Sequence, residues 1–344
     1  MKIKFVLFAL TILIYSNLIV AQSETTPVNQ QKTNVEDSFK PSGNPLGKVF
    51  FNFHSDFENE NINSAFELKR AYFGYSYNLA ENFSTKVLFD VGEADVDVDI
   101  NDSTTIKTST SLKYTAFVKN AQLTYKHDFV TVNVGLIGNP QFSAAEKLWG
   151  HRYIAKNVQD EHKFAPSADF GISANLKIID MLSVDLTVRN GEGYKKLESD
   201  DIFITGLGFH FMPVKGLTFR GYYDYSAGDV AQYTVMHFLG YKNKIFSLGG
   251  EHIYQSNYKY KKDNNHSAVS AYASIEVIDK LELFGRFDTY NMEVDDDNDS
   301  NSIIGGVQYA PVKKVLVALN FQSKMFKDDE NNAYAAFLNF QYAF

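Results

Sequence analysis

The chain has 344 residues, of which 33 are lysine or arginine and 41 are aspartate or glutamate, so its formal net charge is −8. This acidic balance argues against a nucleic-acid-binding protein, which needs a basic patch. The sequence contains no cysteine, which excludes disulfides, thiolate metal sites and a lipidated cysteine within it. Aromatic residues make up 15% of the chain although its mean hydropathy is only −0.25, which indicates apolar residues that alternate with polar ones.

The first segment, residues 1–21, has the pattern of a secretory signal peptide. Lys2 and Lys4 give it a positive start, an apolar stretch follows, and Ala21 ends it at a plausible cleavage position. A membrane-spanning helix is the alternative, but the apolar stretch is shorter than such a helix needs. Residues 22–45 are polar and contain several prolines, and we expect them to form a flexible periplasmic leader.

From residue 46 to residue 344 the chain consists of alternating apolar and polar residues in segments of roughly ten. Very short connections and longer, often acidic ones follow these segments in turn. We therefore predict an all-β fold, a transmembrane antiparallel β-barrel of about 16 strands with short periplasmic turns and longer external loops. The expected strands are 46–57, 66–79, 82–92, 113–127, 129–138, 167–178, 182–190, 202–212, 217–226, 232–242, 245–255, 268–278, 281–290, 302–310, 315–325 and 332–344.

The last expected strand shows the alternation clearly. Its even-numbered side chains from Leu338 to Phe344 are apolar and face lipid, whereas Asn339 and Gln341 face the lumen. We expect this strand to close the barrel by pairing with the first strand near residues 49–53, which leaves no open edge. A lumen enclosed by about sixteen strands is wide enough to hold water.

The longest connection covers residues 139–166. It contains the helix-favouring run 144–148 followed by Trp149, the only tryptophan in the sequence. It is richer in apolar and aromatic residues than a solvated loop needs to be, so we expect it to fold into the barrel as a constriction. The alternative is an ordered external loop.

Charged side chains on the expected lumen face are candidates for selecting solutes. Arg70 and Lys86 lie on neighbouring strands and indicate one basic wall, which would set a transverse field together with carboxylates of the segment 139–166. The alternative for each residue is an ion pair with a neighbour that keeps the lumen hydrated. The candidate pore-lining residues are Arg70, Lys86, Lys126, Glu146, Lys147, Arg152, Asp169, Arg189, Arg220 and Arg286.

Short runs in the first half of the chain share strand and turn patterns with a known family. They are FELKRAYFG at 66–74, NFSTKVLFD at 82–90, VGLIGNPQF at 134–142, RYI at 152–154, DFGIS at 169–173 and VRNGEGY at 188–194.

These runs resemble the phosphate-selective porin O and P family. The resemblance covers roughly residues 46–195 and implies a sixteen-stranded porin, often trimeric, whose third external loop folds into the pore. The family selects phosphate with a ladder of lumenal arginines and a lysine cluster. The arginines of this chain are scattered and have acidic residues nearby, so the resemblance carries over the porin function alone.

The function that follows is passive diffusion of small hydrophilic solutes or ions through a water-filled barrel, in the outer membrane of a Gram-negative bacterium. The alternatives are a channel selective for anions or phosphate, and a barrel enzyme or adhesin. The eight histidines are scattered and no Gly-x-Ser-x-Gly motif occurs, so no enzyme is expected. No cofactor, metal or nucleic acid is expected as a partner. The expected partners are outer-membrane lipid, lipopolysaccharide and further copies of the chain in a homotrimer.

The run of acidic residues at 295–299 permits a calcium-binding alternative, although it lacks the glycine and closing glutamate of a helix–loop–helix calcium site. With similar runs at 95–99 and 328–330, it is expected to form an acidic rim that contacts lipopolysaccharide phosphates through divalent ions.

Overall fold

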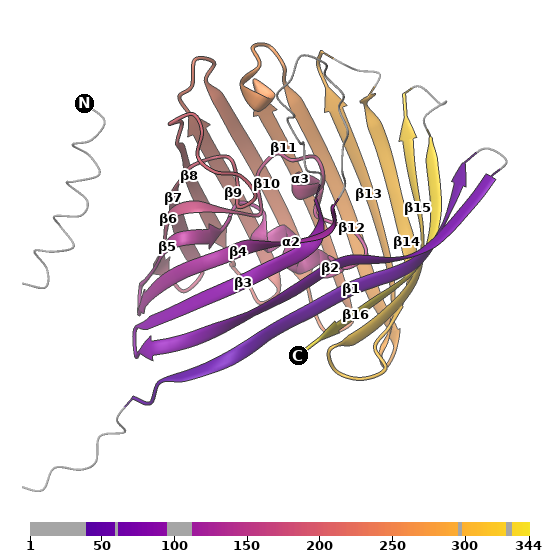
Figure 1. The fold of residues 1–344 in the computed structure, drawn as a ribbon, viewed down its shortest axis with the longest axis horizontal. Helices are drawn as coiled ribbons and strands as arrows, with labels where there is room; N and C mark the ends of the chain where they lie inside the picture. Colours follow the sequence, from indigo (N-terminus) through magenta and orange to yellow (C-terminus); the bar gives the residue numbers. More distant parts are fainter. Residues whose placement is uncertain (1–38, 59–60, 95–111, 295–297, 328–331) are drawn as a thin grey trace, which may run out of the picture. The chain divides into compact units, whose positions relative to one another are not determined.

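The chain forms a closed barrel of sixteen antiparallel strands in the computed structural model, counted over the residues that the structure describes (Figure 1). Each strand pairs with its neighbours in sequence, and β1 pairs with β16. The expected signal peptide, most of the expected leader and the three acidic runs lie at least in large part outside the described residues. The structure describes residues 39–58, 61–94, 112–294, 298–327 and 332–344.

The sixteen strands lie where the alternation predicts them, and most ends differ by only one or two residues. They are β1 Ser42–Glu58, β2 Asn61–Ala80, β3 Phe83–Ala94, β4 Leu112–His127, β5 Val130–Gly138, β6 Ala168–Ile179, β7 Leu182–Arg189, β8 Ile204–Phe211, β9 Leu217–Ser226, β10 Gln232–Lys242, β11 Phe246–Ser256, β12 His266–Ile278, β13 Leu281–Met292, β14 Ser300–Tyr309, β15 Val315–Phe326 and β16 Ala333–Ala343.

The barrel closes between its first and last strands, as expected. Phe51 pairs with Phe340 and their rings stack with centroids 4.8 Å apart. The backbone N–H of Phe344 donates to the carbonyl of Gly47 at 3.0 Å. β1 begins at Ser42, so its first four residues come from the segment assigned to the leader.

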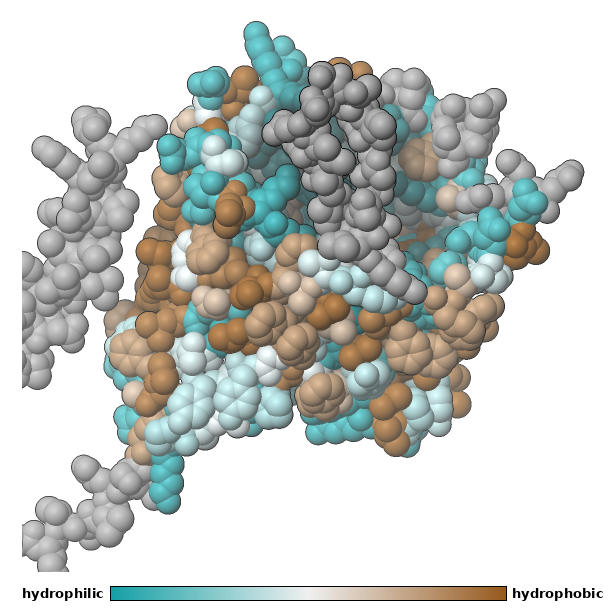
Figure 2. All heavy atoms as spheres, in the orientation of Figure 1, coloured by the Kyte–Doolittle hydropathy of each residue, from teal (hydrophilic) through white to brown (hydrophobic). Residues whose placement is uncertain are grey.

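The two faces of the wall differ as the alternation predicts. In β12, Val269, Ile275 and Val277 are exposed on the outside, whereas Ser270 and Tyr272 are buried inside. Hydrophobic residues gather over the middle of the barrel face seen in Figure 2, and hydrophilic residues gather toward the long-loop end. Among the described residues, no helix combines the length and the hydropathy needed to span a membrane.

Two of the register shifts between described strands each leave a lysine without a partner in the pairing. The β1–β2 pairing skips Lys69 between Phe51 and Phe50, and the β3–β4 pairing skips Lys119 between Phe89 and Leu88. An extra residue of this kind is a β-bulge, and it changes which residues of the strand face inward. As a result, both Lys69 and its neighbour Arg70 line the lumen.

The connection between β5 and β6 carries two short helices, α2 (Ser143–Trp149) and α3 (Val158–Glu161). In Figure 1 both lie within the ring of strands. Gly150 ends α2 in the left-handed conformation with φ 71°, and the Asn157 side chain caps α3 by accepting from the N–H of Gln159. A 3₁₀ turn, η1 (Tyr258–Tyr260), lies between β11 and β12.

Candidate functional site

The segment 139–166 lies inside the barrel and contacts several walls. Tyr153 donates its hydroxyl to Gln308 of β14 at 2.8 Å, and Tyr272 of β12 donates to the carbonyl of Ala145 at 2.9 Å. Tyr153 and Gln308 are 155 positions apart in the chain, and Ala145 and Tyr272 are 127 positions apart. The segment therefore crosses part of the lumen, where it occupies space that water and solutes would otherwise fill.

A buried carboxylate of β11 receives two amides of the segment. Glu251 is only 4% exposed and accepts from the side chains of Asn157 and Gln159, at 2.6 Å each. This arrangement fixes α3 against the wall.

Arg220 and Arg286 each join the wall to the segment. Arg220 forms a two-pronged ion pair with Asp185 and donates to the carbonyls of Pro140, at 3.0 Å, and of Gln141, at 3.3 Å.

Arg286 donates to both oxygens of Asp288, at 2.8 and 2.6 Å, and to the carbonyl of Lys156 at 2.5 Å. Both guanidinium groups are nearly completely buried. Each guanidinium group uses its hydrogen bonds in these contacts. We therefore assign Arg220 and Arg286 mainly to holding the segment in position.

Aromatic packing supports the first half of the segment. The Trp149 ring contacts Tyr272 and Phe284 edge-on, with centroids 5.5 and 6.1 Å apart, and its indole N–H donates to the carbonyl of Ala155 at 3.1 Å. Such edge-to-face pairs add to the energy of burial. The His151 ring lies tilted against that of Phe284, with centroids 4.5 Å apart, and burial lowers the pKa of this histidine.

A cavity of about 510 Å³ lies between residues 152–162 of the segment and the wall from β13 through β16 to β2. Phe50, Tyr153 and Phe337 contribute aromatic surface to it. Basic side chains outnumber acidic ones along the lining. The charged lining residues are Lys69, Arg70, Arg152, Lys156, Arg286 and Lys324 against Asp56, Glu67, Glu161 and Asp288.

On the segment itself, Arg152 lies between two carboxylates. Its Nε atom is 3.5 Å from Glu146 and its Nη2 atom is 3.3 Å from Asp160. Burial raises the pKa of Glu146, and Arg152 opposes that rise. Two further cations of the cavity, Lys156 and Lys324, have no ion pair within the described part of the chain.

A second cluster of charges surrounds Asp90 on the inner face of β3. Arg70 lies 3.3 Å from one carboxylate oxygen, Lys119 lies 3.7 Å from the other, and the hydroxyl of Tyr194 donates to that second oxygen at 2.5 Å. The Lys119 ammonium also lies over the ring of Tyr72, 5.0 Å from its centroid.

The remaining candidates have different surroundings. Lys86 is half-buried on the same strand as Asp90, whereas Lys126 and Lys147 are exposed, at the short-turn end of β4 and on α2. Asp169 accepts backbone N–H groups of Phe170, at 2.9 Å, and Gly191, at 2.8 Å. Arg189 is buried and lies 2.6 Å from Asp224.

The structure thus places Arg70 and Arg152 along the cavity, with Glu146 next to Arg152, and uses Arg189, Arg220 and Arg286 in buried ion pairs. It also adds two residues that alternation placed on the other face, Lys69 and Lys119. A signal in the sequence could have revealed both bulges. Adjacent polar residues at 69–70 and at 119–120 interrupt the period of two, which is typical of a bulge.

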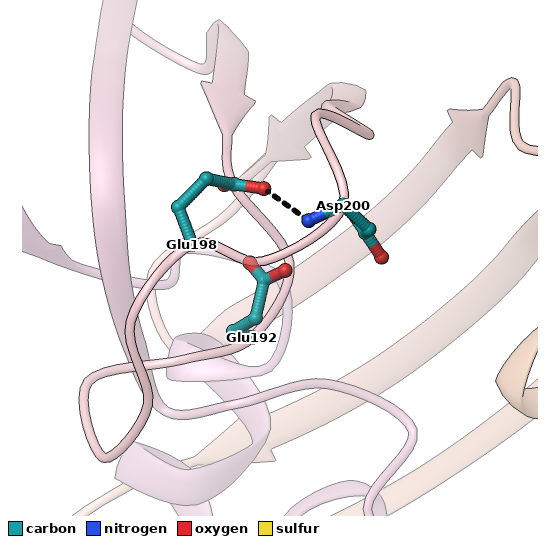
Figure 3. Close-up of side chains that lie close together, drawn as sticks. All are labelled: Glu192, Glu198 and Asp200. Atoms are coloured by element: carbon teal, nitrogen blue, oxygen red, sulfur yellow. Dashed lines mark hydrogen bonds between the residues drawn. The ribbon is translucent and has the colours of Figure 1, made fainter.

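Three carboxylates gather on the connection between β7 and β8, as Figure 3 shows. Glu198 accepts from the backbone N–H of Asp200 at 3.2 Å. Burial raises the pKa of Glu192, and the neighbouring Glu198 and Asp200 add to the rise. Since Glu198 and Asp200 are exposed, we interpret the group as a solvated acidic patch of the loop.

Comparison with solved structures gives similar barrels of low sequence identity. The outer membrane channel DcaP of Acinetobacter baumannii has 11% identity and a TM-score of 0.66, and the match covers 89% of this chain and 99% of that one. The anion-selective porin from Comamonas acidovorans has 13% identity and a TM-score of 0.62, covering 89% and 100%. The outer membrane protein OmpT of Vibrio cholerae in its trimer form has 11% identity and a TM-score of 0.57, covering 90% and 100%.

No protein-family model matches the chain, and no curated protein matches it by sequence. At 11–13% identity the structural similarity establishes the fold, a sixteen-stranded barrel of the kind found in outer-membrane channels.

Proposed function

We propose that this protein is a porin of a Gram-negative outer membrane, through which small hydrophilic solutes and ions diffuse passively. The observation that carries the proposal is a closed barrel with an apolar outer face, a polar inner face and an internal segment that leaves a cavity of about 510 Å³ beside it. A barrel of this kind pairs every wall strand and can enclose an aqueous lumen. The proposed transport involves no chemical step.

Selection in such a channel depends on the width of the passage and on the charges along it. We assign the width to the segment 139–166, which is fastened to the wall by Glu251, Arg220 and Arg286. We assign the charge preference to the basic excess of the cavity lining, which attracts anions.

An anion-selective channel is the second candidate function. The grouping of Arg70 and Lys119 around one carboxylate favours it, as does the basic excess of the cavity lining, to which Lys156 and Lys324 contribute. The resemblance to the phosphate-selective porin O and P family makes phosphate one solute to test. The ion pairs of Arg189, Arg220 and Arg286 argue against a ladder of free arginines in this chain.

For the assembly, we propose outer-membrane lipid and lipopolysaccharide as the surroundings of the apolar outer face, and a homotrimer as the oligomer. The trimer form of the similar OmpT structure supports the latter. The mass of the detergent-solubilised complex would test it, and a monomeric mass would exclude a stable trimer.

Planar-bilayer recording tests the function. Purified protein should produce stepwise increases of current, and in a salt gradient the reversal potential should have the sign of an anion preference. A protein that folds and inserts but yields no current steps would contradict the porin function. Current steps whose reversal potential has the sign of a cation preference would contradict only the anion-selective function.

A further inference from the structure

The connection that follows β7 also turns into the barrel. In the sequence RNGEGY at 189–194, Gly191 has φ 138° and Gly193 has φ 80°, conformations that favour glycine. A Cβ atom on Gly193 would lie 2.6 Å from Pro166, so the backbone is packed tightly against the end of the segment 139–166. The N–H of Gly191 donates to Asp169, and the N–H of Tyr194 donates to the carbonyl of Ala168 at 3.0 Å.

This turn allows Tyr194 to reach the opposite part of the wall. In the sheet order, β4, β5 and β6 separate β7 from β3, yet the Tyr194 hydroxyl donates to Asp90 of β3 at 2.5 Å. The Tyr194 ring also meets Phe117 of β4 edge-on, with centroids 6.5 Å apart. A loop that pointed outward from the end of β7 could not make these contacts.

The next residue adds a positive charge at the same place. The ammonium group of Lys195 lies over the Phe117 ring, 4.9 Å from its centroid, and next to the cluster of Arg70, Lys119 and Asp90. Burial and the nearby Arg70 lower the pKa of Lys195. Arg70 and Lys119 thus share one buried carboxylate, and Lys195 adds a third positive charge nearby, which leaves a local excess of positive charge.

We propose that residues 190–195 form a second inward-folded element, held by the hydrogen bond from Tyr194 to Asp90, and that Lys195 on this element selects small anions. This role is separate from that of the segment 139–166. It rests on the proposed function, because it requires that the barrel conducts. Tyr194 acts as a positioning residue, whereas Lys195 acts directly on the passing ion through its charge.

Tyr194→Phe, recorded in planar bilayers, tests the positioning role. Loss of the hydroxyl removes the bond to Asp90, so single-channel conductance and current noise should both rise. Tyr260→Phe is the matched control, since this tyrosine also lies in a loop and bonds a wall residue, Ser226, at 2.9 Å. Equal conductance of the two variants and the wild type would overturn the positioning role.

Lys195→Gln tests the charge. It should shift the reversal potential in a salt gradient toward cations, whereas Lys196→Gln, which removes the same charge from the next residue, should leave the potential unchanged. Equal shifts for the two variants would contradict a specific role for Lys195.

Because the chain contains no cysteine, Lys195→Cys provides an independent measurement if Tyr194→Phe fails to fold. A bulky thiol reagent should lower the conductance of open Lys195→Cys channels and leave Lys196→Cys channels unaffected. An unaltered Lys195→Cys current would place residue 195 outside the passage and overturn the proposal. Absence of current from the wild type would instead contradict the porin function itself.

Discussion

At the scale of single residues, the buried arginines combine two tasks. Arg286 pairs with Asp288 on its own strand and also donates to a carbonyl of the internal segment. Arg220 of β9 pairs with Asp185 of β7 and donates to the carbonyls of residues 140 and 141. A buried ion pair adds little net stability, but removing one partner leaves an uncompensated charge at a large cost. These pairs therefore specify where the segment lies.

Arg286→Met should destabilise the barrel by about 3–5 kcal/mol, because it leaves the carboxylate of Asp288 buried without its partner. Chemical denaturation of the refolded protein would measure this loss. The double variant Arg286→Met with Asp288→Leu removes both charges and should be less destabilised than the single variant. If the double variant were the less stable of the two, the pair itself would be the main source of stability.

His162 illustrates a residue whose charge state depends on packing. Its ring stacks on Tyr290 with centroids 3.8 Å apart, burial lowers its pKa to about 3, and Lys324 and Arg286 contribute to the lowering. The unfolded chain binds a proton at this position below about pH 6.5 while the folded barrel does not. His162 therefore makes the folded barrel progressively less stable as the pH falls from about 6.5 toward the folded value.

His162→Phe keeps a flat ring on Tyr290 and removes the titrating group. The drop in unfolding temperature between pH 7 and pH 4, measured by heat-dependent electrophoretic mobility, should be smaller in this variant than in the wild type. His127→Phe, at an exposed site of the short-turn end, should retain the wild-type drop. An equal drop in unfolding temperature in the wild type and both variants would show that His162 is not the source of the pH dependence.

At the scale of elements, the segment 139–166 is fastened at points distributed along its length. Hydrogen bonds from β9, β11, β12, β13 and β14 reach it, and most of them involve its backbone carbonyls. Contacts to main-chain atoms depend weakly on the identity of the side chains. The exposed side chains of the segment take little part in holding it against the wall.

Deletion of residues 144–156 should raise single-channel conductance by about twofold or more, because conductance depends on the open cross-section of the passage. Deletion of residues 259–263, which removes the last two residues of η1 and the three that follow, is the control and should leave conductance nearly unchanged. Unchanged conductance in the first variant, with normal assembly, would show that the segment does not limit the flow of ions.

The bulge in β4 allows a comparison within one strand. Lys119 is the extra residue and lies beside Asp90, whereas Lys126 is exposed at the short-turn end. Lys119→Gln should therefore shift the reversal potential toward cations more than Lys126→Gln does, although both variants lose one charge. A larger shift for Lys126→Gln would contradict an effect of the charges around Asp90 on the ions that the channel conducts.

At the scale of the whole molecule, the inner and outer faces of the wall both depend on closure of the sheet. Every described strand has two partners, so the wall has no open edge. The junction of β1 and β16 includes a close contact in which the Phe344 ring covers Gly47, where an added Cβ atom would lie 2.1 Å from the ring.

Gly47→Val should reduce the fraction of assembled barrel, with a cost of about 1–3 kcal/mol from overpacking against Phe344. Gly305→Val is the control, because an added Cβ atom there meets nothing within 4 Å. Combining Gly47→Val with Phe344→Ala should restore part of the assembly, measured by electrophoretic mobility before and after heating. If the double variant assembled no better than Gly47→Val, the loss of assembly would not come from the contact with Phe344.

The sequence by itself determined the strands, their faces and the closure of the barrel. These features follow local rules, because each wall residue faces either lipid or water and each turn or loop is contiguous in the chain. The expected strand ends, the pairing of β1 with β16 and the two faces of β12 depended on nothing more.

Only the tertiary structure decided which charges face the passage. The bulges that turn Lys69 and Lys119 inward depend on the register between strands, and the contact of Tyr194 with Asp90 joins residues 104 positions apart. The burial of Arg220 and Arg286 depends on where the segment 139–166 lies. The contacts of Tyr194, Arg220 and Arg286 form between distant parts of the chain, and no local pattern of residues encodes them.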